Sequence, residues 1–432
     1  MQKKIIALAV AGLATSGAFA QSNVEVYGLV DLSVVSYSGT YSGLVGGTQS
    51  VANPNGVFNG VGKSAHTATG IEYGSRAELA NGMNATSRLG FRGTEKLGNG
   101  LSASFVIESS IAGDGSTAAG SASAPTANIL GDRETTVSLT NSYGSVKLGR
   151  QNLVSMDIID GLDLFDGGVG VIQNLIVNPL SSTRVSNAIR FDSTVMGVEL
   201  AYQYAMSENS DRLNNTRGVG AITNMTASYT AGPLFLTAGH LLARDFGNGL
   251  TPDTTGLAGA NATAAALAYR NRSLSYNHLG ASYDFGIAKL NGQYVTTTST
   301  KTASDEANPA NIAAANAATA LNLMSWVGTG QPLINSSTYM LGLTVPMGAH
   351  KLLGSFVSTN DKRNFNQDAR SLTLGYEYGL SKRTTLYARG SKVNNVNGAT
   401  FGMVGDQSVA LAQTGATLNR TAAYLAGIKH TF

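Results

Sequence analysis

The 432-residue sequence contains no cysteine, which excludes disulfides, thiol catalysis and thiolate metal sites. Charged residues make up only 13% of the chain, and tryptophan occurs once. Beyond its first residues the chain has no apolar run long enough for a transmembrane helix. The low charge and the 52 glycines are typical of many short strands joined by turns rather than of packed helices.

The first twenty residues have the features of a secretory signal peptide. Lys3 and Lys4 provide a positive start, Ile5 to Leu13 an apolar stretch too short to span a bilayer, and Ala18 to Ala20 a small-x-small cleavage site. We therefore expect an exported protein whose single mature domain begins at Gln21 and covers residues 21–432. Removal of the two lysines lowers the formal charge from +3 to about +1, so the basic composition does not indicate nucleic-acid binding.

Apolar and polar residues alternate in one recurring pattern along the mature chain. In the first example, Val24, Val26 and Val30 alternate with Glu25 and Asp31. Sixteen such runs of about ten residues are separated by alternately short and long connections. The long ones include residues 39–86 and residues 301–335, the second with a stretch of helical character from Ala310 to Leu323, and we expect their tips to face outward. This arrangement predicts an all-β fold, a transmembrane antiparallel β-barrel of 16 strands in the outer membrane. A soluble β-sandwich would also alternate, but it does not account for the strand length or for the two ends of the chain.

The predicted strands begin at Asn23, Ser87, Leu101, Arg133, Ser145, Ser186, Val198, Ala221, Leu234, Leu274, Ile287, Ser337, His350, Arg370, Arg383 and Thr421. The last of them ends at Phe432, and an aromatic chain end suits a membrane boundary. We expect Phe432 to face lipid and to end a strand that pairs with the first one. Tyrosines near many strand ends fit aromatic girdles, although Tyr27 has the parity of the polar face.

Strand parity predicts which charges point into the barrel. The charged side chains opposite apolar neighbours are Arg88, Arg92, Glu108, Lys147, Arg190 and Arg389. Glu108 would hold the arginines apart. Arg133 has the parity of the lipid-facing residues, where an arginine at mid-membrane would cost roughly 2 to 4 kcal/mol. We expect it to lie beyond the apolar band at the start of its strand, or to be re-aimed by a bulge; Arg150 poses the same conflict.

The third long connection, residues 151–185, carries an acidic series. Asp157, Asp160 and Asp163 recur every third residue, so a helical turn would line them on one face, with Ile159 and Leu162 elsewhere. Three interpretations remain open. The acids face the lumen, they mark turns, or they form a calcium site, although the spacing departs from the EF-hand pattern.

Four motifs resemble general porins of Gram-negative bacteria, particularly those of β-proteobacteria. Each motif is loose by itself, but their order along the chain is specific, and the similarity runs through nearly all of the mature chain. The motifs are Val24 to Asp31, Ser87 to Gly93 with Leu97 to Leu101 and Glu108-Ser109, Tyr143 to Gln151, and Gly427 to Phe432.

The resemblance implies a homotrimer of sixteen-stranded barrels in the cell outer membrane, surrounded by lipid and lipopolysaccharide. Each barrel would be a water-filled channel for ions and small hydrophilic solutes, narrowed by an inward-folded third loop. The C-terminal phenylalanine, here Phe432, is read by the outer-membrane assembly machinery. By motif, the basic ladder of the family's constriction corresponds to Arg88 and Arg133, and more loosely to Arg184 or Arg190. No cofactor is implied.

Ion selectivity follows from the balance between these charges. The arginines favour anions while the three aspartates oppose them, so we expect a weak anion preference. A substrate-specific channel is the main alternative, but the sequence shows no dense aromatic track. An outer-membrane enzyme needs a nucleophile with a positioned base, and the five histidines lie in scattered segments without such a motif. An adhesin or other structural barrel would have a plugged lumen.

Overall fold

The computed structural model describes residues 23–45, 66–111, 113, 130–176, 183–206, 221–244, 273–299, 334–363, 366–397, 399, 401–402 and 417–432. The expected signal peptide lies outside these ranges. So do residues 301–333, which include the stretch from Ala310 to Leu323 with predicted helical character. Within the described ranges, no helix is both long and apolar enough to cross a membrane.

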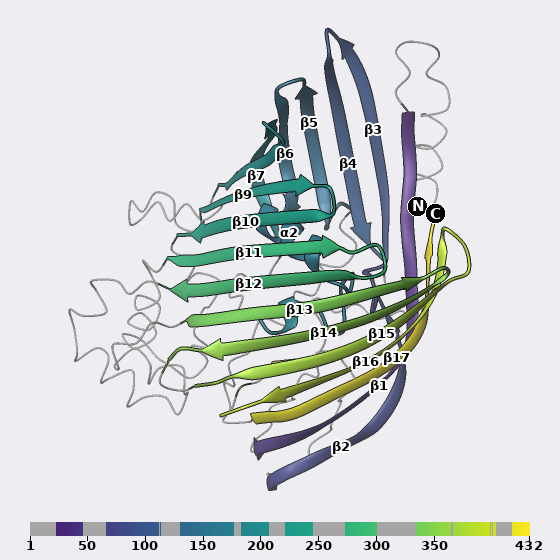
Figure 1. Cartoon of the computed structure of the whole chain (residues 1–432), viewed down its shortest axis with the longest axis vertical. Helices are drawn as coiled ribbons and strands as arrows, with labels where there is room; N and C mark the ends of the chain where they lie inside the picture. Colours follow the sequence, from purple (N-terminus) through teal and green to yellow (C-terminus); the bar gives the residue numbers. More distant parts are fainter. Residues whose placement is uncertain are drawn as a thin grey trace, which may run out of the picture.

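Seventeen strands of the described chain form one antiparallel sheet (Figure 1). They are β1 (Asn23–Val45), β2 (His66–Asn81), β3 (Arg88–Gly98), β4 (Leu101–Ser110), β5 (Glu134–Asn141), β6 (Gly144–Asn152), β7 (Arg184–Val195), β8 (Val198–Ala205), β9 (Ile222–Ala231), β10 (Leu234–Ala243), β11 (Leu274–Asp284), β12 (Lys289–Ser299), β13 (Asn335–Met347), β14 (His350–Asp361), β15 (Ala369–Gly379), β16 (Thr384–Asn395) and β17 (Thr417–Thr431).

Sixteen of these strands close into a barrel, as predicted. From β3 onward each strand pairs with the next, and β1 pairs with both β3 and β17. The predicted starts agree with the observed ones to within four residues, the largest difference being at the last strand, which was expected from Thr421 and begins at Thr417. The pattern was sufficient because a strand half-buried on one face must alternate.

The first and last strands, β1 and β17, pair to close the barrel, and Phe432 takes part in this pairing. The amide of Gly28 donates to the Phe432 carbonyl at 3.1 Å, and the Phe432 amide donates to the Gly28 carbonyl at 3.0 Å. The Phe432 ring lies where a Cβ of Gly28 would be, on the side of the sheet that carries Val24 and Val26. The predicted pairing of Phe432 with the first strand is confirmed, and β1 and β17 run side by side in Figure 1.

The seventeenth strand corrects the prediction of one long loop over residues 39–86. Strand β1 continues to Val45, and β2 pairs with its second half from Leu32 to Val45. The first half of β1, Asn23 to Leu29, pairs instead with β3. One long strand therefore serves two partners in succession. The prediction was wrong because the polar, glycine-rich composition of this segment is typical of loops, whereas backbone pairing with β1 decides its structure.

The two faces of the sheet differ in composition and exposure. On β11, Tyr276 and His278 are buried, whereas the alternate residue Leu279 is 60% exposed. Other strands repeat this arrangement, with buried Gln203 and Asn224 on one face and exposed leucines, valines and tyrosines on the other. We call these the polar face and the apolar face. The polar face is the shielded, inner one, and so wide an exposed apolar surface is typical of a protein in lipid.

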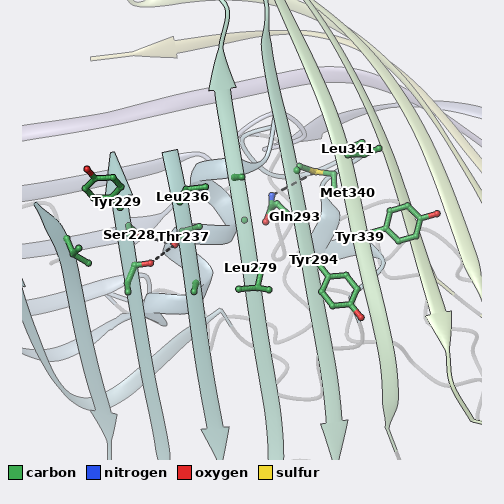
Figure 2. Close-up of a pocket in the computed structure, with 16 residues that line it drawn as sticks. Ser228, Tyr229, Leu236, Thr237, Leu279, Gln293, Tyr294, Tyr339, Met340 and Leu341 are labelled. Carbon is green, nitrogen blue, oxygen red and sulfur yellow. Dashed lines mark hydrogen bonds between the residues drawn. The ribbon is translucent and has the colours of Figure 1, made fainter. Parts of the chain in front are cut away.

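A shallow hollow of about 670 Å³ lies over strands β8 to β13 (Figure 2). Its floor includes the small residues Ala238, Ala281 and Gly292, and two of these, Ala281 and Gly292, are direct cross-strand partners. Tyr229 and Tyr294, both more than two-fifths exposed, stand beside them. The apolar face is therefore uneven here, because small side chains alternate with large ones.

Candidate functional site

The third connection packs against the polar face of the sheet. It runs from the end of β6 to the start of β7 and contains helix α2 (Val154–Leu162) and the 3-10 turn η1 (Ile172–Asn174). The apolar side of α2, with Ile159 and Leu162 fully buried, faces the wall, as predicted for these two residues. Side chains of β12 hold its backbone, since Gln293 Nε2 donates to the Ile159 carbonyl at 3.2 Å and Asn291 Nδ2 to the Leu162 carbonyl at 2.8 Å.

Glycines in the wall permit this close approach. A Cβ on Gly280 of β11 would overlap Leu162 Cδ1, and one on Gly342 of β13 would overlap Leu164 Cδ1. Glycine inside a strand commonly marks such a contact with another segment of backbone or side chain. The sequence contained this signal, because both glycines have the parity of the polar face, but only the fold shows what fills the space.

Glu108 is the centre of a first group of charges on β1, β3, β4 and the start of β5. Its carboxylate lies 2.6 Å from Arg133 Nε and 3.8 Å from Arg88 Nε. Tyr27 also donates its hydroxyl to Glu108 at 3.1 Å. Two guanidinium groups therefore share one carboxylate, which leaves a positive excess in this group. Arg88 and Glu108 lie on the polar face, in agreement with their parity.

Arg133 reaches the polar face because it precedes the regular part of β5, which begins at Glu134. Its side chain is buried, and the amide of the same residue donates to the Glu108 carbonyl at 3.1 Å. Of the two ways in which Arg133 was expected to avoid lipid, the first is therefore observed: it lies just before the regular part of its strand. Arg150 keeps the apolar-face parity, opposite Thr135, and its guanidinium finds polar partners near the end of its strand, donating to the Asp132 carbonyl at 2.5 Å and to Ser186 Oγ at 2.9 Å.

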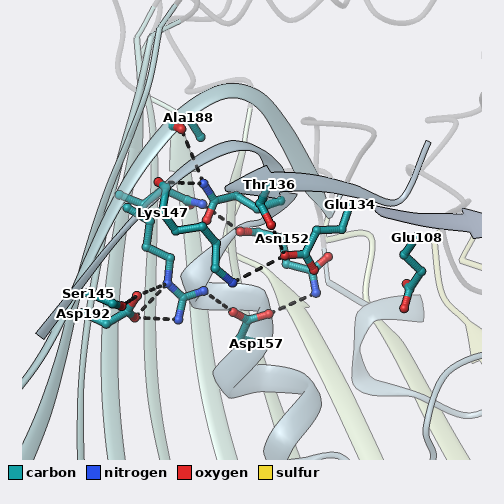
Figure 3. Close-up of polar contacts among 12 residues, drawn as sticks. Glu108, Glu134, Thr136, Ser145, Lys147, Asn152, Asp157, Ala188 and Asp192 are labelled. Atoms are coloured by element: carbon teal, nitrogen blue, oxygen red, sulfur yellow. Dashed lines mark hydrogen bonds and ion pairs between the residues drawn. The ribbon is translucent and has the colours of Figure 1, made fainter. Parts of the chain in front are cut away.

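Arg190 joins the wall to the third connection, and its two acidic partners, Asp157 and Asp192, are labelled in Figure 3. Its Nη1 lies 2.7 Å from Asp157 Oδ2 on α2, and its Nη2 lies 2.7 Å from Asp192 Oδ1 on β7. Asn152 Nδ2 donates to the second oxygen of Asp157 at 3.0 Å. Here two carboxylates share one guanidinium, the reverse of the Glu108 group. Asp157 is thus a wall-bound acid of the connection.

Lys147 lies between the two groups. Its Nζ is 3.4 Å from Glu134 Oε1, and in the sheet its backbone is paired with that of Arg190. Glu134, Asp192 and Asn152 were not singled out in the sequence, although Glu134 has the polar-face parity opposite Val137 and could have been identified from it. These charged side chains form one row across β3 to β7, which we call the charged belt. Its members are Arg88, Glu108, Arg133, Glu134, Lys147, Arg190 and Asp192.

The other two aspartates of the acidic series differ from Asp157. Asp160 is exposed and accepts a hydrogen bond from Gln173 Nε2. Although its side chain has open surface, the surrounding protein displaces much of the nearby water, and this desolvation, together with the carboxylates of Asp163 and Asp157, raises the pKa of Asp160. Arg184, at the start of β7, opposes this rise through its positive charge. The structure therefore places Arg184 near the acidic series.

Asp163 caps the end of α2 rather than continuing it. Its carboxylate accepts hydrogen bonds from the amides of Phe165 at 3.0 Å and Ile172 at 2.7 Å, which is turn chemistry. Desolvation by burial raises the pKa of Asp163 to about 6, against the opposing effect of these amides. The prediction of one helical face for all three acids was wrong at this residue. Across the parts of the chain that the structure describes, no group of three or more His, Asp or Glu side chains could hold a metal ion.

Comparison with known proteins gives consistent matches. The family described as "Gram-negative porin" matches residues 7–398. Outer membrane porin protein 32 of Delftia acidovorans is 27% identical over 447 aligned positions that cover 100% of both chains. A second relative, an outer membrane porin protein of Bordetella pertussis, is 28% identical over 427 aligned positions that cover 91% of this chain and 95% of the relative.

A solved structure shows the same fold. It is the anion-selective porin from Comamonas acidovorans, which superimposes with a TM-score of 0.65 at 24% sequence identity and covers 95% of this chain and 100% of its own. Fold, relatives and family agree, and the members of this family are channels. The chain belongs to the Gram-negative porin family, and it is a channel protein of the bacterial outer membrane, not an enzyme.

Proposed function

We propose that this porin is a general diffusion channel with a weak anion preference, narrowed where the third connection faces the charged belt. The observation that carries the proposal is the Arg190 to Asp157 contact, which brings charges of the wall and of the connection within 2.7 Å of each other. A passage bordered by both would expose permeant ions to fixed charges that water screens poorly. In this proposal Arg88, Arg133, Arg184 and Arg190 supply the positive side, and Glu108, Asp157, Asp160 and Asp163 the negative side.

The sign of the preference depends on protonation. The guanidinium groups stay charged at any physiological pH. The pKa of Asp160, raised to about 8, removes part of the opposing negative charge near neutrality, whereas Asp163, with a pKa of about 6, is mostly charged there. The local balance is therefore positive but small, because most members of the charged belt are already paired.

Planar bilayer recording tests this function. Purified protein should form open channels, and under a KCl gradient the zero-current potential should have the sign of a modest anion preference. A clear cation preference would overturn the selectivity, and absence of conductance would overturn the diffusion channel. Block of the current by one particular solute would instead indicate a substrate-specific channel.

The apolar face is the surface that we propose contacts outer-membrane lipid and lipopolysaccharide. Hydrocarbon chains would cover its exposed leucines and valines and fill the hollow beside Tyr229 and Tyr294. Some of this face would be covered by other copies in a homotrimer. Cross-linking in native outer membranes should then give a trimer band, and a purely monomeric population would contradict the homotrimer.

Phe432 is proposed as the residue through which the assembly machinery recognises the chain. It is 45% exposed at the end of β17, so its ring is accessible on the apolar face. Deletion of Phe432 should reduce the yield of assembled barrel in membranes far more than the conductance of the barrels that do assemble. Normal assembly without Phe432 would refute the role.

A further inference from the structure

Arg389 of β16 is a buried arginine whose partners are mainly carbonyl oxygens. Its side chain is only 5% exposed, and its Nη1 donates to the carbonyls of Val169 at 2.7 Å and Gly167 at 3.3 Å. Its Nη2 donates to Asn84 Oδ1, and its guanidinium lies 4.2 Å from the centre of the Phe165 ring. Among the described residues it forms no ion pair. A permeating ion would have little access to this charge.

These partners belong to two segments that are far apart in sequence. Phe165 to Val169 is the tip of the third connection, beyond α2, whereas Asn84 lies in the link between β2 and β3. The segments also contact each other directly, since the Val169 amide donates to the Met83 carbonyl at 3.3 Å. Gly168, with φ of 69°, approaches Met83 so closely that a Cβ there would overlap the Met83 carbonyl. One guanidinium thus holds two otherwise separate segments together.

Asp31 of β1 anchors the second segment to the wall. Its side chain is fully buried, and one carboxylate oxygen accepts from the amides of Asn84 at 2.7 Å and Ala85 at 2.8 Å. The other oxygen accepts from the Tyr387 hydroxyl at 2.5 Å. Tyr387 lies two residues before Arg389 on the same face of β16. Strand β16 therefore contacts Asn84 directly through Arg389 and indirectly through Tyr387 and Asp31. The link between β2 and β3 is therefore a buried support, although the sequence predicted that it belongs to one long loop over residues 39–86.

We propose that Arg389 is a positioning residue that fixes the tip of the third connection and thereby sets the width and steadiness of the open channel. Its hydrogen bonds to Gly167, Val169 and Asn84, which we call the latch, hold the tip in place, and its charge does not select the permeant ions. The proposal rests on the proposed function, in which that connection narrows the channel. Its physical basis is the planar guanidinium, whose several N–H donors satisfy three acceptors in different directions at once, which the single ammonium of lysine does not reproduce.

The test compares Arg389→Lys and Arg389→Met with Lys147→Met, a matched control that removes a cation from the charged belt. In single-channel recordings both Arg389 variants should show larger open-channel current fluctuations and increased conductance, with little shift of the zero-current potential under a KCl gradient. Lys147→Met should shift that potential toward cations with a steady current. The result for Arg389→Lys is decisive, since it keeps the charge but not the donor geometry.

Asn84→Ala gives a second variant that leaves the wall charge intact, should the Arg389 variants assemble poorly. It removes one acceptor of the latch and should produce the same fluctuations to a smaller extent. Steady currents in Arg389→Lys and Asn84→Ala, or a shift of the zero-current potential in Arg389→Met as large as that in Lys147→Met, would overturn the latch. If Lys147→Met shifts the potential while the latch variants behave as the natural protein, the proposed channel function stands and only the latch fails. A natural protein that does not conduct refutes the function itself.

Discussion

Two arginines of the barrel wall, Arg190 and Arg389, hold two different parts of the third connection, the start of its helix and its tip. Arg190 meets the helix near its start through the Asp157 carboxylate and also pairs with Asp192 of its own strand, and its side chain is 19% exposed. Arg389 meets the tip through carbonyl oxygens and a phenylalanine ring, and it is 5% exposed. In the proposed function the first charge borders the ion path, while the second serves mainly as a set of hydrogen-bond donors. Residue type and inward parity alone do not distinguish these roles, since both arginines share them.

Stability should separate the two arginines most clearly. Arg389→Met leaves buried carbonyls without donors, and each such group costs about 1–3 kcal/mol, whereas Arg190→Met removes a partly exposed ion pair worth about 0–1 kcal/mol. Urea titration of the purified barrels, followed by the loss of the heat-modifiable folded band on gels, should give a clearly lower midpoint for Arg389→Met. Equal midpoints for the two variants would remove the energetic basis of the distinction.

The next largest effect is on ion selectivity, where substitution of Arg190 should matter more than substitution of Arg389. Arg190→Met leaves Asp157 and Asp192 without their shared counter-charge, so the zero-current potential under a KCl gradient should move clearly toward cations. Arg389→Met should move it much less. Arg190→Lys is the control, because it keeps the charge and should retain most of the anion preference. A larger shift from Arg389→Met than from Arg190→Met would reverse the assignment of the two residues.

A smaller change in selectivity is expected for Asp157→Asn. This substitution removes one of the two carboxylates that neutralise Arg190, so the anion preference should increase, but only in part because Asp192 still pairs with the guanidinium at 2.7 Å. The double variant Asp157→Asn with Asp192→Asn should increase it further. An unchanged zero-current potential in both variants would show that the Arg190 group lies outside the ion path.

A weaker effect still is a dependence of selectivity on pH. The pKa of Asp163 is raised to about 6 and that of Asp160 is raised as well, so both carboxyl groups are neutral at acid pH and become charged as pH rises through these values. Each deprotonation adds a negative charge to the third connection, and the anion preference should therefore decline as pH rises. Zero-current potentials recorded over a pH series test this. Asp160→Asn should flatten the curve, and an anion preference that grows with pH would contradict the protonation scheme.

The barrel and most of its inner surface could be predicted from the sequence. Arg88, Glu108 and Arg190 lie on the polar face because a strand with one lipid-facing side alternates strictly, and residue number then determines direction. The same local rule gave the sixteen strand starts, and the closure that a barrel requires predicted the pairing of Phe432 with β1. Parity alone would have put Arg133 on the lipid side, a conflict that its place just before a regular strand resolves, and the rule missed β2.

Local sequence was enough for the number of barrel strands and for the direction in which most side chains point, because each of these depends on neighbours along the chain. The partners of the charged side chains required the folded barrel. Glu108 is shared by Arg88 and Arg133, Asp157 belongs to Arg190, and Arg389 joins the tip of the third connection to the link between β2 and β3. Such contacts join residues up to several hundred positions apart, as Arg389 and Asn84 show. The contact of Arg389 with Asn84 exists because closing β17 onto β1 brings the first and last strands together, and strand alternation carries no information about that distance.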